Sequence, residues 1–340
     1  MFTKNISFQN FKTKTNVKNI KKKLKKILND ENEVINSLSE NYKNSFISKK
    51  LKKKYSKLNF RVIGMGGSVL GTQSIYEFFK KKIKKKFIFI NNLDASRKKP
   101  DQKNYTNLIV SKSGNTIETI ANLNILIKKK DKNIFITENK KNYLKILAQK
   151  LKSEIIYHNN YIGGRYSVLS EVGMLPAELM GLNIKNFKQL NNIIKNKNFL
   201  NSLIVNVAAT LNFIRNKKYN SIIINYDESS ESLFKWYQQL IAESLGKKSN
   251  GLLPVISNLP RDNHSMMQLY LDGPRNNFYT FFDVLDSPKN SYLAKIKLAQ
   301  KKATKIVFKK KKLPFRCINL RDRSEGSLRA RRRACLDPCA

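Results

Sequence analysis

The spacing of apolar residues changes near residue 60 of the chain. Before that point, side chains such as Ile20, Leu24 and Ile27 recur at helical spacing within lysine-rich segments, which predicts a helical lead-in over residues 1–55. After it, short β-rich runs alternate with helical segments; the runs are FRVIGMGG from residue 60, FIFI from 87, NLIVSKSG from 107, NIFIT from 133 and SEIIYH from 153. This rhythm predicts a parallel sheet with helices on both faces, which binds ligands at the carboxyl ends of its strands.

A second α/β series follows a predicted helix over residues 178–196. Its expected strands are NSIIINY from 220, FYTFFDV from 278, KATKIVFK from 302 and FRCINL from 315. A chain of 340 residues is long enough for two such cores. We therefore predict an α/β protein with a lead-in over 1–55, a first domain over 56–178, a second over 179–327 and an atypical Arg/Cys-rich tail over 328–340.

The net charge of +43 would suit a nucleic-acid-binding protein, but its distribution does not. The lysines form short runs at separate places, mixed with Asn and Ile: 21–26, 49–54, 80–86, 128–132 and 309–312. These three residue types share A/T-rich codons, so we interpret the charge as compositional bias and expect no specific nucleic-acid partner. A positive envelope would still steer a phosphorylated dianion toward the protein.

The sequence also bears on location and on metals. It contains no run of about 18 apolar residues of the kind that spans a membrane, and its opening lacks the apolar core of a secretory signal, so we expect a cytoplasmic protein without a membrane partner. Cys317, Cys335 and Cys339 lack metal-ligand spacing and partnering histidines. We therefore expect neither a zinc site nor a disulfide framework.

A glycine-rich turn joins the run at residue 60 to a predicted helix that begins near Ser68. Gly64 and Gly66 match the first two positions of the dinucleotide fingerprint GxGxxG, but Val69 occupies the third, which disfavours nicotinamide binding. Close packing in a tight turn and contact with a ligand are both open interpretations of this turn.

The run at residue 107 ends in Ser111, Lys112, Ser113, Gly114, Asn115 and Thr116. Three hydroxyls and several backbone N–H groups at the start of a helix match the needs of a phosphate monoester, whose oxygens accept many hydrogen bonds. The alternative is a helix N-cap by Ser113 or Thr116, with Glu118 supporting the first turn. A cap needs one hydroxyl and this loop has three, so we favour a phosphate-binding loop.

Two further segments carry candidate chemistry. Arg165 follows Gly163 and Gly164, and an arginine between glycines can approach a ligand closely and stabilise negative charge, although it could instead form a salt bridge between domains. Glu243 ends an apolar helical face and could be merely a helix C-terminal residue. The chain has only two histidines, His158 and His264, and a lone histidine is more often structural than catalytic.

Four segments, GMGGSVLG, SKSGNTIET, GGRYSVLSEVG and QQLIAESLGK, together resemble the glucose-6-phosphate isomerase family over roughly residues 60 to 300. The resemblance implies two sugar-isomerase (SIS) domains, each a flavodoxin-like three-layer sandwich. It also implies a set of site residues. The substrate phosphate would bind Ser111, Lys112, Ser113 and Thr116, Gly67 and Ser68 would line the sugar, Gln239 would contact the substrate, Arg165 would stabilise an enediolate, Glu243 would be the base and His264 would help open the ring.

The reaction implied is the interconversion of glucose 6-phosphate and fructose 6-phosphate in glycolysis and gluconeogenesis. One carboxylate can remove the C2 proton and return it at C1, so neither metal nor other cofactor is implied. In this family the histidine comes from the neighbouring subunit, which implies a homodimer that shares His264. The alternatives are an isomerase that also accepts mannose 6-phosphate and a non-catalytic sugar-phosphate-binding SIS protein.

The end of the sequence departs from the family. Members normally continue with a segment whose glutamine and lysine complete the site, whereas no lysine follows Lys312 here and residues 329–340 read RARRRACLDPCA. We interpret this as a frameshifted or truncated end and expect it to leave binding intact but to impair isomerisation. The alternative is a basic tail that binds nucleic acid.

Overall fold

The structure, a computed structural model, describes residues 6–30, 32–55, 58–96, 105–128, 130–286 and 291–323. The chain forms two compact units. The central unit comprises Glu31–Lys188 and Ser232–Leu240, and the flanking unit comprises Met1–Asp30, Gln189–Glu231 and Ile241–Ala340. The atypical tail predicted over 328–340 lies outside the described residues.

The central unit contains a parallel five-stranded sheet in the order β3-β2-β4-β5-β6. Its strands are β2 (Asn59–Gly64), β3 (Phe87–Ile90), β4 (Tyr105–Val110), β5 (Asn133–Glu138) and β6 (Glu154–His158). These are the five apolar runs predicted from residue 60 to 158, and the structure confirms all of them. Their continuous apolar character follows from burial on both faces of the sheet.

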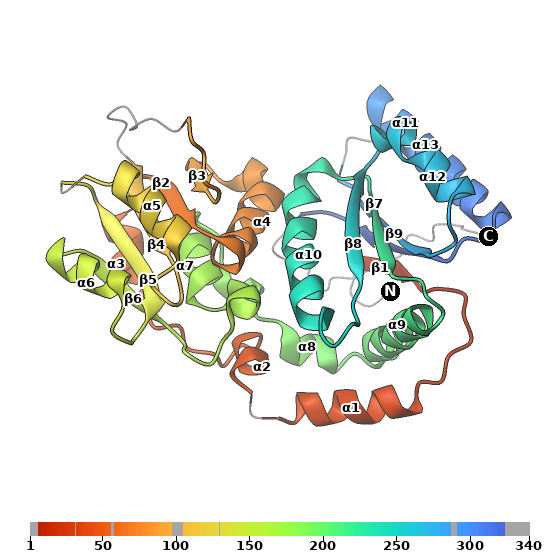
Figure 1. Cartoon of the computed structure of the whole chain (residues 1–340), viewed down its shortest axis with the longest axis horizontal. Helices are drawn as coiled ribbons and strands as arrows, with labels where there is room; N and C mark the ends of the chain where they lie inside the picture. Colours follow the sequence, from red (N-terminus) through yellow and green to blue (C-terminus); the bar gives the residue numbers. More distant parts are fainter. Residues whose placement is uncertain are drawn as a thin grey trace. The chain divides into compact units, whose positions relative to one another are not determined.

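Helices cover both faces of this sheet (Figure 1). Successive residues of β4 point to opposite faces of the sheet. Leu108 and Val110 pack with α3 (Ser48–Lys54), α4 (Leu70–Phe79) and α7 (Glu171–Leu179) on one face. Ile109 packs with α5 (Ile117–Leu126) and α6 (Tyr143–Lys150) on the other. The helix α2 (Glu33–Ser37) precedes α3. The unit is therefore the three-layer α/β sandwich that we predicted.

The flanking unit has a second five-stranded sheet, β1-β10-β9-β7-β8. Its strands are β1 (Ile6–Gln9), β7 (Asn220–Asn225), β8 (Leu253–Asn258), β9 (Asn277–Val284) and β10 (Phe315–Leu320), and all but the antiparallel β1 run in parallel. Phe213 of α9 (Lys197–Arg215) and Ile241 of α10 (Glu231–Leu245) pack on one face. Tyr270 of α12 (Met267–Asp272) and Phe308 of α13 (Tyr292–Lys310) pack on the other.

The predicted strand from residue 302 is wrong, because those residues belong to α13. Ser291 Oγ accepts a hydrogen bond from Ala294 N and caps this helix, and Lys301 and Phe308, seven residues apart, are both buried on the same face. Ile306 and Val307 are exposed, so the local apolar run had a helical rather than an alternating pattern of burial.

Two further segments differ from the prediction. The single helix expected over 178–196 is interrupted, because Gly181 adopts φ +89° just after α7 and a 3₁₀ turn at Ile184–Asn186 precedes α8 (Leu190–Ile194). The lead-in contains α1 (Lys18–Leu28) but begins with β1, which pairs with β10. The units therefore do not follow contiguous stretches of sequence, since residues 1–30 join the flanking unit and 232–240 join the central one.

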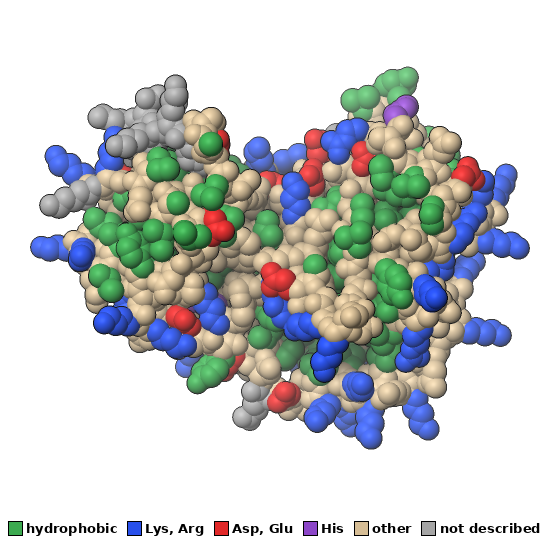
Figure 2. All heavy atoms as spheres, viewed as in Figure 1, with side chains coloured by type: hydrophobic (Ala, Val, Ile, Leu, Met, Phe, Trp, Pro, Cys, Tyr) green, Lys and Arg blue, Asp and Glu red, His purple; other side chains and the backbone are tan. Residues whose placement is uncertain are grey.

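The surface carries many cations. On the face drawn in Figure 2, Lys and Arg side chains are scattered widely and do not gather in one patch. In the part of the chain that the structure describes, no helix combines the length and apolar character required to cross a membrane.

Buried and exposed ion pairs of the flanking unit give a test of the fold. Asp283 and Lys301 are both buried, with 2.7 Å between Asp283 Oδ2 and Lys301 Nζ, whereas the Asp272–Lys311 pair is exposed. We expect Asp283→Ala to lower the free energy of unfolding by about 3–5 kcal/mol, because it leaves a buried ammonium uncompensated. Asp272→Ala should cost at most about 1 kcal/mol. Denaturant titration measures the free energy of unfolding of both variants, and equal costs would contradict the buried position of the Asp283–Lys301 pair.

Candidate functional site

The order of strands in the central unit places a topological switch point between β2 and β4. The chain passes from β2 to β3 on one side and then returns to β4 on the other, so the loops after β2 and β4 diverge from neighbouring strands. Gly64 and Val110, the last residues of β2 and β4, are paired in register. Open α/β sheets bind ligands at such a switch point. The two loops that begin here are the glycine-rich turn, residues 64–68, and the hydroxyl loop, residues 111–116.

The hydroxyl loop is organised by its own side chains. Ser111, which is buried, lies with its Oγ 2.8 Å from Thr116 Oγ1 and accepts a hydrogen bond from Gly114 N (3.2 Å). Ser113 Oγ is exposed and accepts from Asn115 N (3.3 Å). The loop therefore brings three hydroxyls and the start of α5 into one short turn.

The alternative of a simple helix cap does not match this geometry. Thr116 occupies the N-cap position of α5, but its side chain makes no capping hydrogen bond there. Its hydroxyl bonds to Ser111, and that of Ser113 bonds within the loop. Glu118 lies in the first turn of α5, as the alternative expects, and its charge favours the helix dipole, but the N-cap side chain makes no hydrogen bond to the backbone N–H groups there.

The start of α6 holds this loop in shape, and sequence reasoning missed it. Gly114 adopts φ +67°, and a Cβ there would lie 2.1 Å from Asn142 Oδ1. Asn142 Oδ1 caps α6 by accepting from Lys145 N, and Leu144 N donates to Gly114 O (3.1 Å). Asn115 Oδ1 accepts from Tyr143 N (3.0 Å). An asparagine at a helix start, about one turn beyond a strand, was the available signal, but only proximity identifies its partner.

Lys112 is turned away from the hydroxyls. Its Nζ donates to Asn160 O (2.7 Å), and its carbonyl accepts from Glu138 N and Thr137 Oγ1. In this conformation its contribution to the loop is to tie it to the ends of β5 and β6. Its charge nevertheless lies in the same segment as the three hydroxyls.

The glycine-rich turn packs against the segment that carries Arg165. A Cβ on Gly67 would lie 2.4 Å from the backbone of Gly164, and Ser167 Oγ donates to both Gly164 O (2.6 Å) and Gly67 O (3.4 Å). Ser68 ends the 3₁₀ turn Gly66–Ser68 and is half-buried. Gly67 is therefore required for close approach of two backbones.

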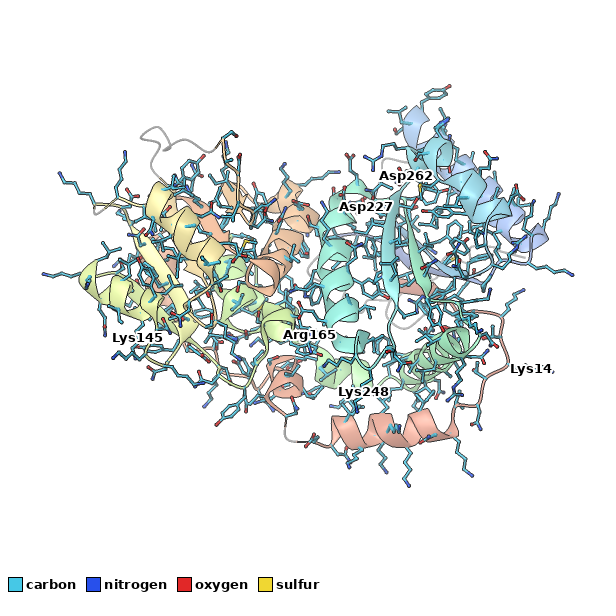
Figure 3. The ribbon with its side chains drawn as sticks, in the orientation of Figure 1. Lys14, Lys145, Arg165, Asp227, Lys248 and Asp262 are labelled. Carbon is cyan, nitrogen blue, oxygen red and sulfur yellow. The ribbon has the colours of Figure 1, made fainter. Side chains whose placement is uncertain are left out.

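Arg165 comes from the 3₁₀ segment η3 (Gly164–Leu169) after β6 and is labelled in Figure 3. Its guanidinium carbon lies 4.7 Å from the centre of the Tyr166 ring, and its carbonyl accepts from Trp236 Nε1 (3.1 Å). Trp236, which sequence reasoning also missed, thus connects α10 to the arginine. Stacking on an aromatic face leaves the planar guanidinium preorganised for an anion.

The helix α10 carries two of the predicted residues. Gln239 lies against the glycine-rich turn, where a Cβ on Gly66 would be 2.9 Å from Gln239 Nε2. Glu243 follows four residues later, hence on the same face of the helix one turn further on, and it is exposed. Gln239 belongs to the central unit and Glu243 to the flanking unit.

His264 also belongs to the flanking unit, where it is exposed in the short helix α11 (Asp262–Ser265). The central unit therefore brings together Gly67, Ser68, the hydroxyl loop, Arg165 and Gln239. Glu243, which follows Gln239 on helix α10, and His264 both belong to the flanking unit.

His158 is a structural residue of the central unit. It is buried at the end of β6, with Nε2 3.0 Å from Ile162 O and Nδ1 3.4 Å from Glu171 Oε2. Burial favours the neutral carboxyl of Glu171, but the hydrogen bonds from His158 and Tyr42 outweigh it and lower the pKa of Glu171. This cluster fixes the junction of η3 and α7, just beyond Arg165.

Lys188 packs against the same cluster. Its ammonium lies 4.1 Å from the centre of the Tyr42 ring and is within 3.3 Å of Asn44 Oδ1. Burial lowers the pKa of Lys188 to about 8, although the charge of Glu171 acts in the opposite direction. The cluster therefore contains a lysine whose charged form is disfavoured by the fold.

The corresponding switch point of the flanking unit carries paired charged side chains. There β7 and β9 diverge in the same way, but Arg323 forms ion pairs with Asp227 after β7 and with Asp286 after β9. Asp227, labelled in Figure 3, and Asp286 place negative charge at this edge. Of the two switch points, the one in the central unit is suited to an anion. Within the described ranges, no group of three or more His, Cys, Asp or Glu side chains could hold a metal ion.

The three-layer α/β sandwich with the hydroxyl loop at its switch point is typical of the sugar-isomerase (SIS) type of α/β protein. The chain belongs to the phosphoglucose isomerase family, because the family model described as phosphoglucose isomerase matches residues 9–256. It is 36% identical over 232 residues to a glucose-6-phosphate isomerase of Methanocaldococcus jannaschii, a match that covers 63% of this chain and 57% of that relative. The chain spans little more than half the length of the curated relatives it matches.

Solved structures show the same fold. A hypothetical protein of Thermus thermophilus is similar with a TM-score of 0.74 and 20% identity, over 92% of this chain and 85% of that one. A glucose-6-phosphate isomerase of Chlamydia trachomatis gives 0.64 and 18% identity, over 83% and 64%. Both agree with the predicted fold class.

Gly114 in the hydroxyl loop and Gly164 beside Arg165 give a matched test of the geometry. Gly114→Ala places a Cβ on Asn142 at a positive φ and should lower the free energy of unfolding by about 1–3 kcal/mol. Gly164→Ala adds a Cβ that meets nothing within 4 Å and should change stability by less than about 0.5 kcal/mol. Thermal unfolding distinguishes them, and equal melting temperatures would show that Asn142 does not hold the loop.

The depressed pKa of Lys188 gives a pH dependence. Its folded pKa of about 8 lies below the ordinary 10.5, so the unfolded chain binds more protons between these values and stability should rise as pH increases from 8 toward 10.5. Lys188→Met should flatten this rise, whereas Lys150→Met at an exposed position should not. Denaturant midpoints at pH 7.5 to 10 measure the effect, and parallel curves for Lys188→Met and wild type would contradict it.

Proposed function

We propose that this protein interconverts glucose 6-phosphate and fructose 6-phosphate through a cis-enediolate, acting in sugar-phosphate metabolism of the cytoplasm. The observation that carries the proposal is the hydroxyl loop, in which Ser111, Ser113 and Thr116 surround the start of α5 without capping it. Phosphate oxygens accept several hydrogen bonds each and are favoured by the helix dipole. The similarity to glucose-6-phosphate isomerases supports the choice of substrate.

The sugar would then extend from the phosphate toward the glycine-rich turn. Gly67 and Ser68 belong to the neighbouring turn, which begins at the same level of the sheet, and Gln239 lies against this turn. A side chain at position 67 would collide with Gly164, so this position requires glycine. A glycine backbone can also approach a sugar hydroxyl closely. Lys112 would add positive charge to the phosphate end.

Glu243 is our proposed base. It lies one helical turn from Gln239 on the same face of α10, which directs both side chains alike. It would remove the C2 proton and return it at C1, so a single carboxylate serves both directions. Arg165, preorganised on Tyr166, would stabilise the negative charge of the enediolate oxygens.

His264 is our proposed group for opening the sugar ring, contributed by a second copy of the chain in a homodimer. Its exposure in α11 is compatible with such a role. A coupled assay of fructose 6-phosphate formation from glucose 6-phosphate tests the proposal as a whole. Binding of 6-phosphogluconate without turnover would instead favour a sugar-phosphate-binding protein that does not catalyse, and turnover of mannose 6-phosphate would widen the substrate range.

The hydroxyl loop can be tested by binding alone. The double variant Ser113→Ala, Thr116→Ala removes two hydroxyls and should raise the dissociation constant for 6-phosphogluconate at least about tenfold, because each hydrogen bond to a charged group contributes roughly 1.5–3 kcal/mol. Ser96→Ala, at an exposed turn outside the loop, is the control. Calorimetry measures both, and unchanged affinity in the double variant would place the phosphate elsewhere.

The role of Glu243 can be tested by isotope exchange. Glu243→Gln keeps the shape of the side chain but removes the base, and it should slow incorporation of solvent deuterium at C2 by about 10²–10⁴. Glu228→Gln, another exposed glutamate, should have no effect. If the Glu243→Gln protein exchanged deuterium at the wild-type rate, a different base would have to be sought.

A further inference from the structure

A cavity of about 1050 Å³ lies at the amino-terminal edge of the flanking unit's sheet. Parallel strands begin there, so the residues that precede β7, β9 and β10 come to one edge. Because β1 is antiparallel, its carboxyl end and the segment Asn10–Thr13 reach the same edge. The cavity is thus built by four segments distant in sequence, and it belongs to a different unit from the hydroxyl loop.

The lining of this cavity is strongly cationic. Each of the three parallel strands contributes one cation from just before its start, namely Lys218, Arg275 and Lys312, and Lys12 and Lys309 add to them. None of the described lining residues is acidic. Lys311 also lines the cavity but is paired with Asp272 (2.5 Å), so its charge is already compensated.

The lysine-rich composition alone does not account for this arrangement. Exposed lysines elsewhere project into water, whereas Lys218 is half-buried and its Nζ donates to Arg275 O. Burial lowers the pKa of Lys218, and the neighbouring charge of Arg275 lowers it further. Lys218 and the exposed Arg275 destabilise each other's charge, and an anion between them would relieve that repulsion.

A polar atom on the wall is also unsatisfied. Thr13 Oγ1 is buried and has no hydrogen-bond partner among the described residues. Such an orphaned hydroxyl costs stability unless something outside the chain bonds to it. A hydrogen-bonding ligand in the cavity would satisfy this hydroxyl, while the cationic lining carries the argument for an anion.

We propose that this cavity binds a small oligophosphate, an anion with at least two linked phosphate groups. Its cations come from three strand starts and the end of α13, and this number of positive charges matches an anion with several charged groups better than a single phosphate. Its volume is that of a small-molecule pocket rather than an extended surface for nucleic acid. The free oligophosphate and a nucleoside polyphosphate share this chemistry.

Calorimetry with sodium tripolyphosphate, ATP and inorganic phosphate at about 150 mM salt tests the proposal, since this salt screens exposed charges beyond roughly 8 Å. We expect saturable one-to-one binding of tripolyphosphate, of ATP or of both, at least about tenfold tighter than that of inorganic phosphate. Binding of ATP alone identifies a nucleotide, and equal binding of both identifies the oligophosphate group as sufficient. Absence of saturable binding by either overturns the proposal.

Two triple variants with the same loss of charge separate a built site from general attraction. Lys218→Gln, Arg275→Gln, Lys312→Gln should weaken binding at least about tenfold. Lys22→Gln, Lys23→Gln, Lys26→Gln, at exposed positions of α1, should weaken it less than about twofold. Equal weakening in the two variants overturns the proposal.

Two further variants guard against misfolding and against confusion with the hydroxyl loop. Thr13→Val keeps shape and removes the orphaned hydroxyl, so it should weaken binding several-fold without lowering the melting temperature, and unchanged affinity counts against the site. The variant Ser113→Ala, Thr116→Ala should bind oligophosphate as wild type does. Loss of binding there would assign the anion to the hydroxyl loop and overturn the proposal.

Discussion

The pairing of β2 with β4 is the constraint on which the candidate site depends. Because Gly64 lies opposite Val110, both strands end at the same level and their loops begin side by side. A Cβ on Gly64 would lie 2.6 Å from Val110 O, so the last residue of β2 must be glycine for the strands to pair in this register. A shift of one residue would turn every side chain of the strand to the other face and separate the loops.

Close contacts at two glycines connect the loops to the rest of the central unit. Gly67 packs on Gly164, and Gly114 packs on Asn142. Each contact joins a loop after one strand to a segment after another, so the hydroxyl loop, the turn and Arg165 are located by elements that rigid packing holds in place. The buried His158–Glu171 pair then anchors the far end of the Arg165 segment.

The two units place different residues at equivalent positions of their sheets. Both sheets have a switch point, but in the central unit its loops carry hydroxyls and backbone amides, whereas in the flanking unit Arg323 forms ion pairs with Asp227 and Asp286. Carboxylates beside such a switch point repel a phosphate. The fold thus provides a location, and the residues in the loops decide its chemistry.

The sequence by itself determined the central sheet and most of the candidate loops, because continuous apolar runs and hydroxyl-rich turns are local signals of burial and of polarity. It did not determine which remote segments meet. Asn142 and Trp236 support the site from positions whose partners are 28 to 71 residues away. The strand β1 pairs with β10, which lies more than 300 residues later in the chain. The apolar run from residue 302 is a helix because Phe308 packs on strands contributed by other segments. These pairings depend on burial against segments that are distant in the sequence. The periodicity of apolar residues indicates which positions are buried, but not which segment covers them.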